Sequence, residues 1–159
     1  MPYLEHFFTF EMSVSRDADG QWVRGFSRWI GVTNNFVAEL WGLREGLMLC
    51  RSLNLSSLVI ELDTKSIVNV LNNLSYANNF ISRILDDCRL LISHMPQIRI
   101  KHCFRQANHC ADRLARISFS QTSEFSLFDS SPMDMFDVYE DDLNEMYFDR
   151  IYPKPCVSF

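Results

Sequence analysis

The feature that most constrains the fold is a repeated change of hydrophobic spacing along residues 8–117. Short runs rich in β-branched and aromatic residues alternate with longer runs whose apolar residues recur every three or four positions. The pattern predicts strands at 8–16, 21–30, 56–62 and 97–104, and helices at 36–53, 64–74, 78–94 and 107–117. This order predicts an α/β fold in which helices flank a mixed central sheet.

The apolar stripes of two predicted helices indicate which side chains form the core. One stripe comprises Phe36, Leu40, Leu43, Leu47 and Cys50, and the other comprises Ile81, Ile84, Leu85, Cys88, Leu91 and Ile92. Asn34 or Asn35 precedes the first of these helices, and either is a suitable N-cap. His102 alternates with Ile100 and Phe104 on one face of a strand, so we expect His102 in the core.

The charge distribution separates a domain from a tail. Residues 1–120 carry 13 Lys and Arg against 11 Asp and Glu, whereas residues 121–159 carry 2 against 9. A chain of 159 residues has room for one domain, so we expect a domain over 1–120 and an acidic tail over 121–159. The first part could meet a polyanion, but the acidic tail could not do so unaided.

Cysteine use and hydropathy indicate an intracellular chain. The five cysteines are odd in number and form no CxxC pair, which favours free thiols in a reducing compartment, the cytoplasm or the nucleus. No apolar run reaches the roughly 18 residues of a membrane span, and the first residues lack the basic start of a secretory signal. We therefore expect a monomer that does not associate with membranes.

Three carboxylates stand where an ordinary surface role fits poorly. Asp63 directly follows a buried strand, Glu39 lies beside an apolar helix stripe, and Asp112 lies in the first turns of the last helix. In an open α/β sheet, carboxylates at strand ends and on flanking helices can converge at one edge. Converging carboxylates bind Mg²⁺, and two such ions about 4 Å apart can activate a water molecule against a phosphodiester.

Each of these carboxylates also has a simpler explanation. Asp63 could cap the helix that follows it, and Asp112 could be favoured by the dipole of its own helix. Glu39 could pair with Arg44 or Arg113 at the edge of the core. Spacing along the sequence leaves these alternatives open.

Four motifs in a fixed order resemble one family. They are GFSR at 25–28, AELWGL at 38–43, ELDTKS at 61–66 and RQANHCADRLA at 105–115. Over about residues 13–120 the chain resembles the ribonuclease H-like superfamily. Within it, the motifs are most similar to the plant reverse transcriptase-like (type I ribonuclease H) family, which derives from non-LTR retrotransposons.

The resemblance implies a five-stranded sheet with a central first strand and a site of four carboxylates that holds two Mg²⁺ or Mn²⁺ ions. Glu39, Asp63 and Asp112 match three of these catalytic, metal-binding carboxylates. The implied activity is endonucleolytic hydrolysis of RNA in RNA–DNA hybrids, and the implied partner is such a hybrid or double-stranded RNA. Candidate nucleic-acid contacts are Arg24, Arg28, Asn34, Asn35, Lys65, Arg105, Asn108 and Arg113.

The sequence departs from the family at its start. The family opens with a strand that carries its first metal-binding Asp before a Gly, and no Asp-Gly pair stands upstream of residue 13. We therefore expect that strand to be incomplete or replaced, with residues 3–12 as one candidate to fill part of the gap. A two-ion site is expected only if the carboxylate set is complete. Two hypotheses follow: a hybrid-cleaving ribonuclease, and a catalytically inactive module that binds nucleic acid or protein.

Overall fold

The structure is a computed structural model of the chain, and the residues that it describes are 8–10, 24–31, 33–55, 57–62, 64–73, 81–102, 122–130 and 156–158. Its helices are α1 (Asn35–Ser52), α2 (Lys65–Asn72) and α3 (Ser82–Ser93). Its strands are β1 (Phe8–Phe10), β2 (Gly25–Arg28), β3 (Ser57–Leu62), β4 (Gln97–His102), β5 (Phe125–Phe128) and β6 (Cys156–Ser158). Within these ranges, no helix is both long and apolar enough to cross a membrane.

Helix α1 is fixed by its cap and by its apolar stripe. The Asn34 side chain accepts a 2.9 Å hydrogen bond from the backbone N–H of Val37, which satisfies a donor that the first turn leaves unpaired. Along the helix, Leu40, Leu43 and Leu47 are fully buried. Because burial of one such side chain contributes about 2 kcal/mol, the stripe holds α1 against the rest of the fold.

The described strands form two sheets of three strands each. In one sheet, β2 lies between β1 and β5 and is antiparallel to both. In the other, β3 lies between β4 and β6 and is parallel to both, with Ile60 opposite Ile100 on one side and Val157 on the other. The connection from β3 to β4 contains α2 and α3, as a crossover between parallel strands requires.

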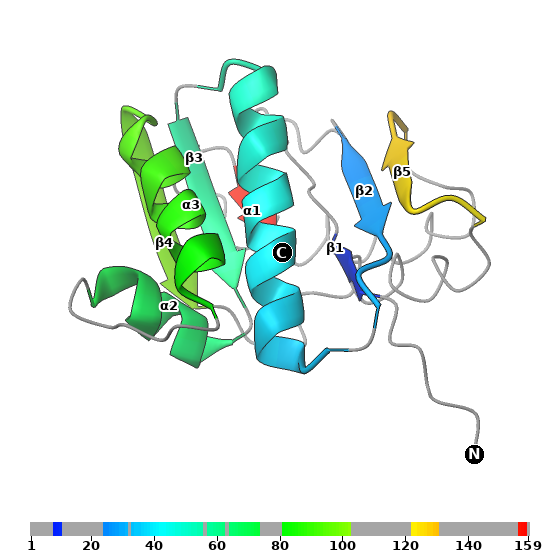
Figure 1. Cartoon of the computed structure of the whole chain (residues 1–159). Coiled ribbons are helices and arrows are strands. Elements are labelled where there is room, and N and C mark those ends of the chain that lie inside the picture. Colours follow the sequence, from blue (N-terminus) through cyan, green and yellow to red (C-terminus); the bar gives the residue numbers. More distant parts are fainter. Residues whose placement is uncertain are drawn as a thin grey trace, which may run out of the picture.

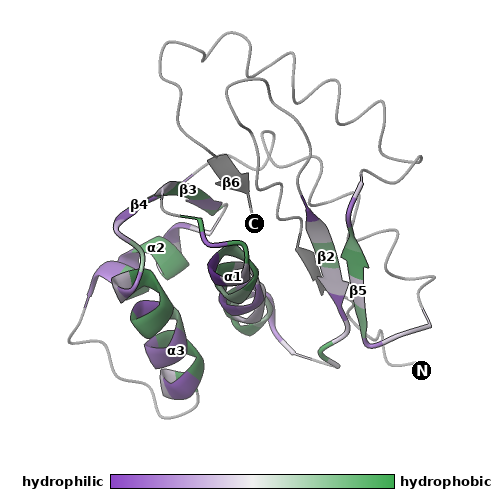
Figure 2. Ribbon diagram, turned by 90° about the horizontal axis from the view of Figure 1, so that it is seen from above, coloured by the Kyte–Doolittle hydropathy of each residue, from purple (hydrophilic) through white to green (hydrophobic). Residues whose placement is uncertain are grey.

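Helix α1 stands between the two sheets, with α3 beside it in front of β3 and β4 (Figure 1). Seen from above, α1 and α3 lie on the same side of the sheet formed by β4, β3 and β6 (Figure 2). The inward side chains of both helices meet Ile60 and Leu62 of β3 and Phe26 of β2 in one buried cluster. The core therefore joins elements of both sheets through α1.

The α/β class and most of the predicted elements are confirmed. The three helices nearly coincide with the predicted ones, and Asn34 rather than Asn35 is the N-cap of α1. Cys50 and Cys88 are buried free thiols, as their stripes predicted. The helix expected at 107–117 lies outside the described residues.

The single five-stranded sheet is wrong for the part of the chain that the structure describes, because β2 and β3 belong to separate sheets. Residues 8–10, which belong to the candidate segment 3–12, form β1, and this strand pairs with β2. Beside β3, however, the ladder partner is β6. Backbone N–H and C=O groups along that edge of β3 need partners, and the strand formed by residues 156–158 provides them.

Two strands lie in the segment that we expected as an acidic tail, 121–159. Strand β5 pairs with β2, and β6 pairs with β3. Residues 125–128 and 156–158 of this segment are therefore strands of the two sheets.

The expectation that His102 is a core residue is wrong. His102 is the last residue of β4 and is exposed. Strand β4 lies at the edge of its sheet, so its two faces are less covered than those of β3. Even Ile98 and Ile100 of this strand are only partly buried.

Candidate functional site

The lower end of the fold in Figure 1 combines the start of α1 with the carboxyl ends of β3 and β4. Open α/β sheets bind their ligands just outside the carboxyl ends of the strands. Glu39 lies in the second turn of α1, and residue 63 comes directly after Leu62, the last residue of β3. The described structure therefore places Glu39 near this end of the molecule, and β3, which precedes Asp63 in the sequence, ends there.

Glu39 is partly buried between the buried residues Ala38 and Leu40. The alternative that Glu39 pairs with Arg44 is wrong, because the carboxylate partners of Arg44 are Glu45 and Asp87. Carboxylate oxygen is the ligand type that Mg²⁺ prefers, and a partly shielded carboxylate attracts a cation more strongly than an exposed one. Glu39 therefore fits the chemistry of a divalent-cation ligand.

The N-cap position of helix α2 is Thr64, in an extended conformation. Asp63 precedes it along the sequence, so the alternative that the Asp63 side chain caps this helix stays open beside the metal role. Asp63 and Asp112 lie outside the described residues. Among the described residues, no three His, Cys, Asp or Glu side chains form a group that could hold a metal ion. The metal site with Glu39, Asp63 and Asp112 thus stays a prediction.

The predicted nucleic-acid contacts fall into three groups. Arg24 forms a 3.0 Å ion pair with Asp129, and Arg28 pairs with Glu45 at 2.6 Å and with Glu124 at 3.6 Å. Asn34 caps α1, whereas Asn35 and Lys65 are exposed first residues of α1 and α2. Arg105, Asn108 and Arg113 lie outside the described residues. Of the predicted contacts in the described part, Asn35 and Lys65 are exposed and belong to none of the ion pairs above.

A network of charged side chains that connects α1 with β2 and α3 was not predicted from the sequence. Glu45 accepts hydrogen bonds from Arg28 and Arg44, and the Arg44 Nε donates to Asp87 of α3 at 2.8 Å. Both guanidinium groups also lie over the Trp41 ring, at 5.7 and 5.5 Å from its centroid. The hydrogen bond to Asp87 is the main reason that the pKa of Arg44 is raised. Residues 17 and 43 positions apart in the sequence give no local signal of such contacts.

Comparison with known families assigns the chain to one of them. Residues 13–118 match the family described as Reverse transcriptase-like. The chain belongs to the reverse transcriptase-like family. This confirms the resemblance that the four motifs indicated, over nearly the same residues.

A related protein and a related structure extend the match. This family member is 33% identical over 129 residues to an Arabidopsis thaliana protein whose name gives it provisionally as a ribonuclease H protein. That match covers 81% of the chain but 21% of the relative, so the chain spans about a fifth of the relative's length. The fold is similar to the N-terminal RNase H domain of a Mycobacterium tuberculosis protein, solved as a fusion with maltose-binding protein. The TM-score is 0.53 at 25% identity, over 58% of this chain and 67% of the other. The family member is therefore ribonuclease H-like in sequence and in fold.

Proposed function

We propose that this chain is a ribonuclease H-type domain that binds nucleic acid and hydrolyses the RNA strand of RNA–DNA hybrids. The observation that carries the proposal is the shared location of Glu39 and the carboxyl end of β3, which Asp63 follows. The family match covers the three motifs in which Glu39, Asp63 and Asp112 stand. The proposed site is therefore the end of the fold at which α1 begins and β3 and β4 end.

In this proposal, Glu39, Asp63 and Asp112 hold Mg²⁺ or Mn²⁺ through their carboxylate oxygens. A bound divalent ion supplies Lewis acidity and a more acidic water molecule for attack on a phosphodiester. The protein's own part is to fix the carboxylates: α1 holds Glu39 rigidly because its neighbours Ala38 and Leu40 are buried. Asp63 is bounded on one side by Leu62, a buried residue of β3, and on the other by the N-cap of α2.

The substrate contacts in this proposal begin at the starts of two helices. Lys65 is the exposed first residue of α2, and its ammonium adds to the favourable N-terminal field that a phosphate meets there. Asn35 is the exposed first residue of α1 and can donate from its side-chain amide to a groove edge. Arg24 and Arg28 would first have to exchange their carboxylate partners for phosphate, so they rank lower.

A second candidate function is a domain that binds nucleic acid or protein without cleaving it. One observation favours it: no Asp-Gly pair stands upstream of residue 13, where the family carries its first metal-binding Asp. For both candidate functions we propose an intracellular location, because Cys50 and Cys88 are free thiols and free thiols persist in reducing compartments.

A labelled RNA–DNA hybrid, incubated with the chain in Mg²⁺ or Mn²⁺, tests the proposal. We expect cleavage of the RNA strand, and a loss of about a hundredfold or more in Glu39→Gln and Asp63→Asn, with hybrid binding retained. Asp86→Asn is the matched control, because Asp86 is an exposed carboxylate on α3. Binding without cleavage in the unmodified chain would support the second candidate. Absence of both would contradict the ribonuclease and would leave only a protein-binding domain.

A further inference from the structure

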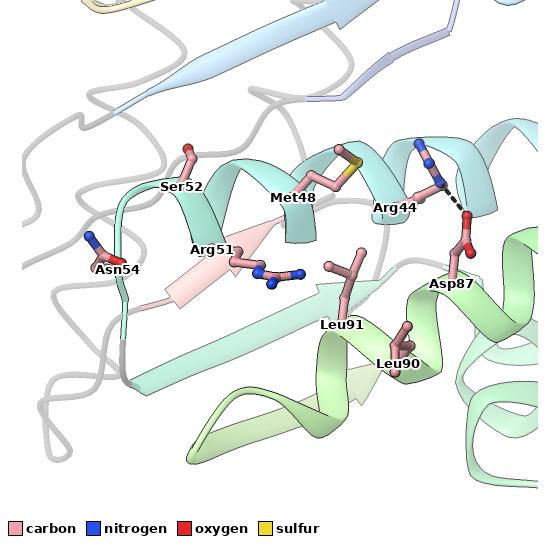
Figure 3. Close-up of a pocket in the computed structure, with 8 residues that line it drawn as sticks. All are labelled: Arg44, Met48, Arg51, Ser52, Asn54, Asp87, Leu90 and Leu91. Atoms are coloured by element: carbon pink, nitrogen blue, oxygen red, sulfur yellow. Dashed lines mark hydrogen bonds and ion pairs between the residues drawn. The ribbon is translucent and has the colours of Figure 1, made fainter.

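A groove lies between α1 and α3 (Figure 3). Its volume is about 560 Å³, which is within the range of ligand and peptide anchor pockets. It is lined by Arg44, Met48, Arg51, Ser52, Asn54, Asp87, Leu90 and Leu91. These residues belong to the second half of α1, the turn that follows it, and residues 87–91 of α3, whereas Glu39 belongs to the first half of α1.

Three apolar side chains line part of the groove: Met48, Leu90 and Leu91. Met48 of α1 is 44% exposed and Leu90 of α3 is 57% exposed, and Leu91 lies between them in Figure 3. Leu91 belongs to the core cluster, whereas Met48 and Leu90 lie off the buried stripes of their helices. Single exposed apolar side chains are ordinary on a protein surface, but here two of them border the same groove. The groove therefore offers an apolar contact that remains open to solvent.

Of the two arginines that line the groove, one has a carboxylate partner among the described residues. Arg44 is held by Asp87 across one end of the groove at 2.8 Å. Arg51, in the last turn of α1, forms no ion pair with any residue in the described ranges, and its side chain extends along the groove toward Leu91 (Figure 3). The lining contains two arginines and one aspartate, so its net charge is positive.

We propose that the groove between α1 and α3 docks an acidic amphipathic helix of a partner protein. A helix laid between two others places apolar side chains at spacings of three, four and seven residues, which suits Met48 and Leu90 on opposite sides. A carboxylate on the same helix would reach Arg51, which lacks such a partner in the described structure. Nucleic acid is the poorer fit, because a phosphate backbone would face the Asp87 carboxylate and leave Met48 and Leu90 without an apolar contact.

The test is fluorescence anisotropy with the full chain and a labelled helical peptide that carries leucines on one face and glutamates on the other. We expect saturable binding, weakened about tenfold or more by Leu90→Ser and by Arg51→Glu. A second peptide, with lysines in place of the glutamates, should bind Arg51→Glu better than it binds the unmodified chain. This exchange separates a direct charge contact from a loss of folding.

Matched controls lie on other faces of the fold. Leu127→Ser changes an exposed leucine of β5, and Arg99→Glu reverses an exposed charge on β4. Both should leave peptide affinity within about twofold. Absence of binding to the unmodified chain, or equal binding by all variants, overturns the proposal.

Three further results would also overturn it by assigning another occupant or another chemistry. Equal affinity for a glutamine version of the peptide would remove the acidic character of the partner. Displacement of the peptide by an RNA–DNA hybrid would assign the groove to nucleic acid. A dimer of the chain that dissociates in Leu90→Ser would assign it to a second copy.

Discussion

The Arg28 guanidinium and the Glu45 carboxylate form an ion pair of 2.6 Å that joins β2 to α1. Glu45 is the more buried partner, with a side chain that is 13% exposed. The same carboxylate oxygen also accepts from Arg44, which in turn reaches Asp87 on α3. Glu45 therefore stands at the centre of a polar connection between β2, α1 and α3.

Replacing Glu45 tests that connection. Glu45→Gln should lower the free energy of unfolding by about 1–3 kcal/mol, because two guanidinium groups lose a partly buried anionic partner. Urea denaturation measures the change. Asp129→Asn removes the partner of Arg24 in an exposed pair and should change the same free energy by less than about 1 kcal/mol. Equal effects of the two substitutions would show that the Glu45 pairs contribute no more than surface ones.

The core stripe of α1 gives a second prediction. Leu43→Ala should destabilise the fold by about 3 kcal/mol, because Leu43 is fully buried and its removal leaves a cavity. Leu127→Ala, at an exposed position of β5, should change the free energy of unfolding by less than about 0.5 kcal/mol. Thermal or urea unfolding of the two variants side by side checks this. A small effect at Leu43 would contradict the described packing of α1.

The buried thiols predict a dependence of stability on pH. Burial raises the pKa of the Cys88 thiol from 9.0 to about 12. Above pH 9 the unfolded chain loses this proton while the folded chain retains it up to about pH 12, so rising pH favours unfolding in this window. The contribution of the thiol is fully present below pH 9.

The unmodified chain should therefore lose free energy of unfolding more steeply above pH 9 than a Cys88→Ala variant does. Urea denaturation at a series of pH values compares the two slopes. Parallel slopes would mean that the Cys88 thiol is not held in a water-poor environment when the chain is folded.

Strand β6 gives a fourth prediction. Val157→Pro should raise the hydrogen-exchange rates of backbone amides in β3, because proline cannot donate to a ladder and disrupts the short strand opposite Val59, Ile60 and Glu61. Val157→Thr keeps a β-branched residue and should leave those rates nearly unchanged. Unchanged rates in both variants would contradict the pairing of β6 with β3.

The sequence predicted what depends on local spacing. The stripe from Leu40 to Cys50 and an N-cap at Asn34 or Asn35 follow from periodicity and from capping chemistry, and the structure has the stripe and the cap at Asn34. The short strand β6 was not predicted, because its three residues acquire strand structure from the free edge of β3 rather than from their own pattern. His102 was misplaced because alternation identifies a shared strand face but cannot show whether another layer covers it.

Only part of the candidate site could be predicted from the sequence, because contacts between distant elements leave no local pattern. The motif around Glu39 marks the residue, and its position on α1 agrees with the proposed site. The partners of Arg28 and Arg44 depend on how β2, α1 and α3 pack, which no local pattern specifies. Met48 and Leu90 carried a signal that was available: they are apolar residues off the buried stripes of amphipathic helices.

A titration with paramagnetic Mn²⁺, followed by NMR, measures whether Glu39, Asp63 and Asp112 converge around a divalent cation. We expect the backbone amide signals of Glu39 and Thr64 to broaden first. We also expect Asp63→Asn to abolish this effect and Asp86→Asn to leave it unchanged. Broadening confined to the acidic segment 121–159, or broadening near Glu39 that is unchanged in Asp63→Asn, would contradict convergence of the three carboxylates.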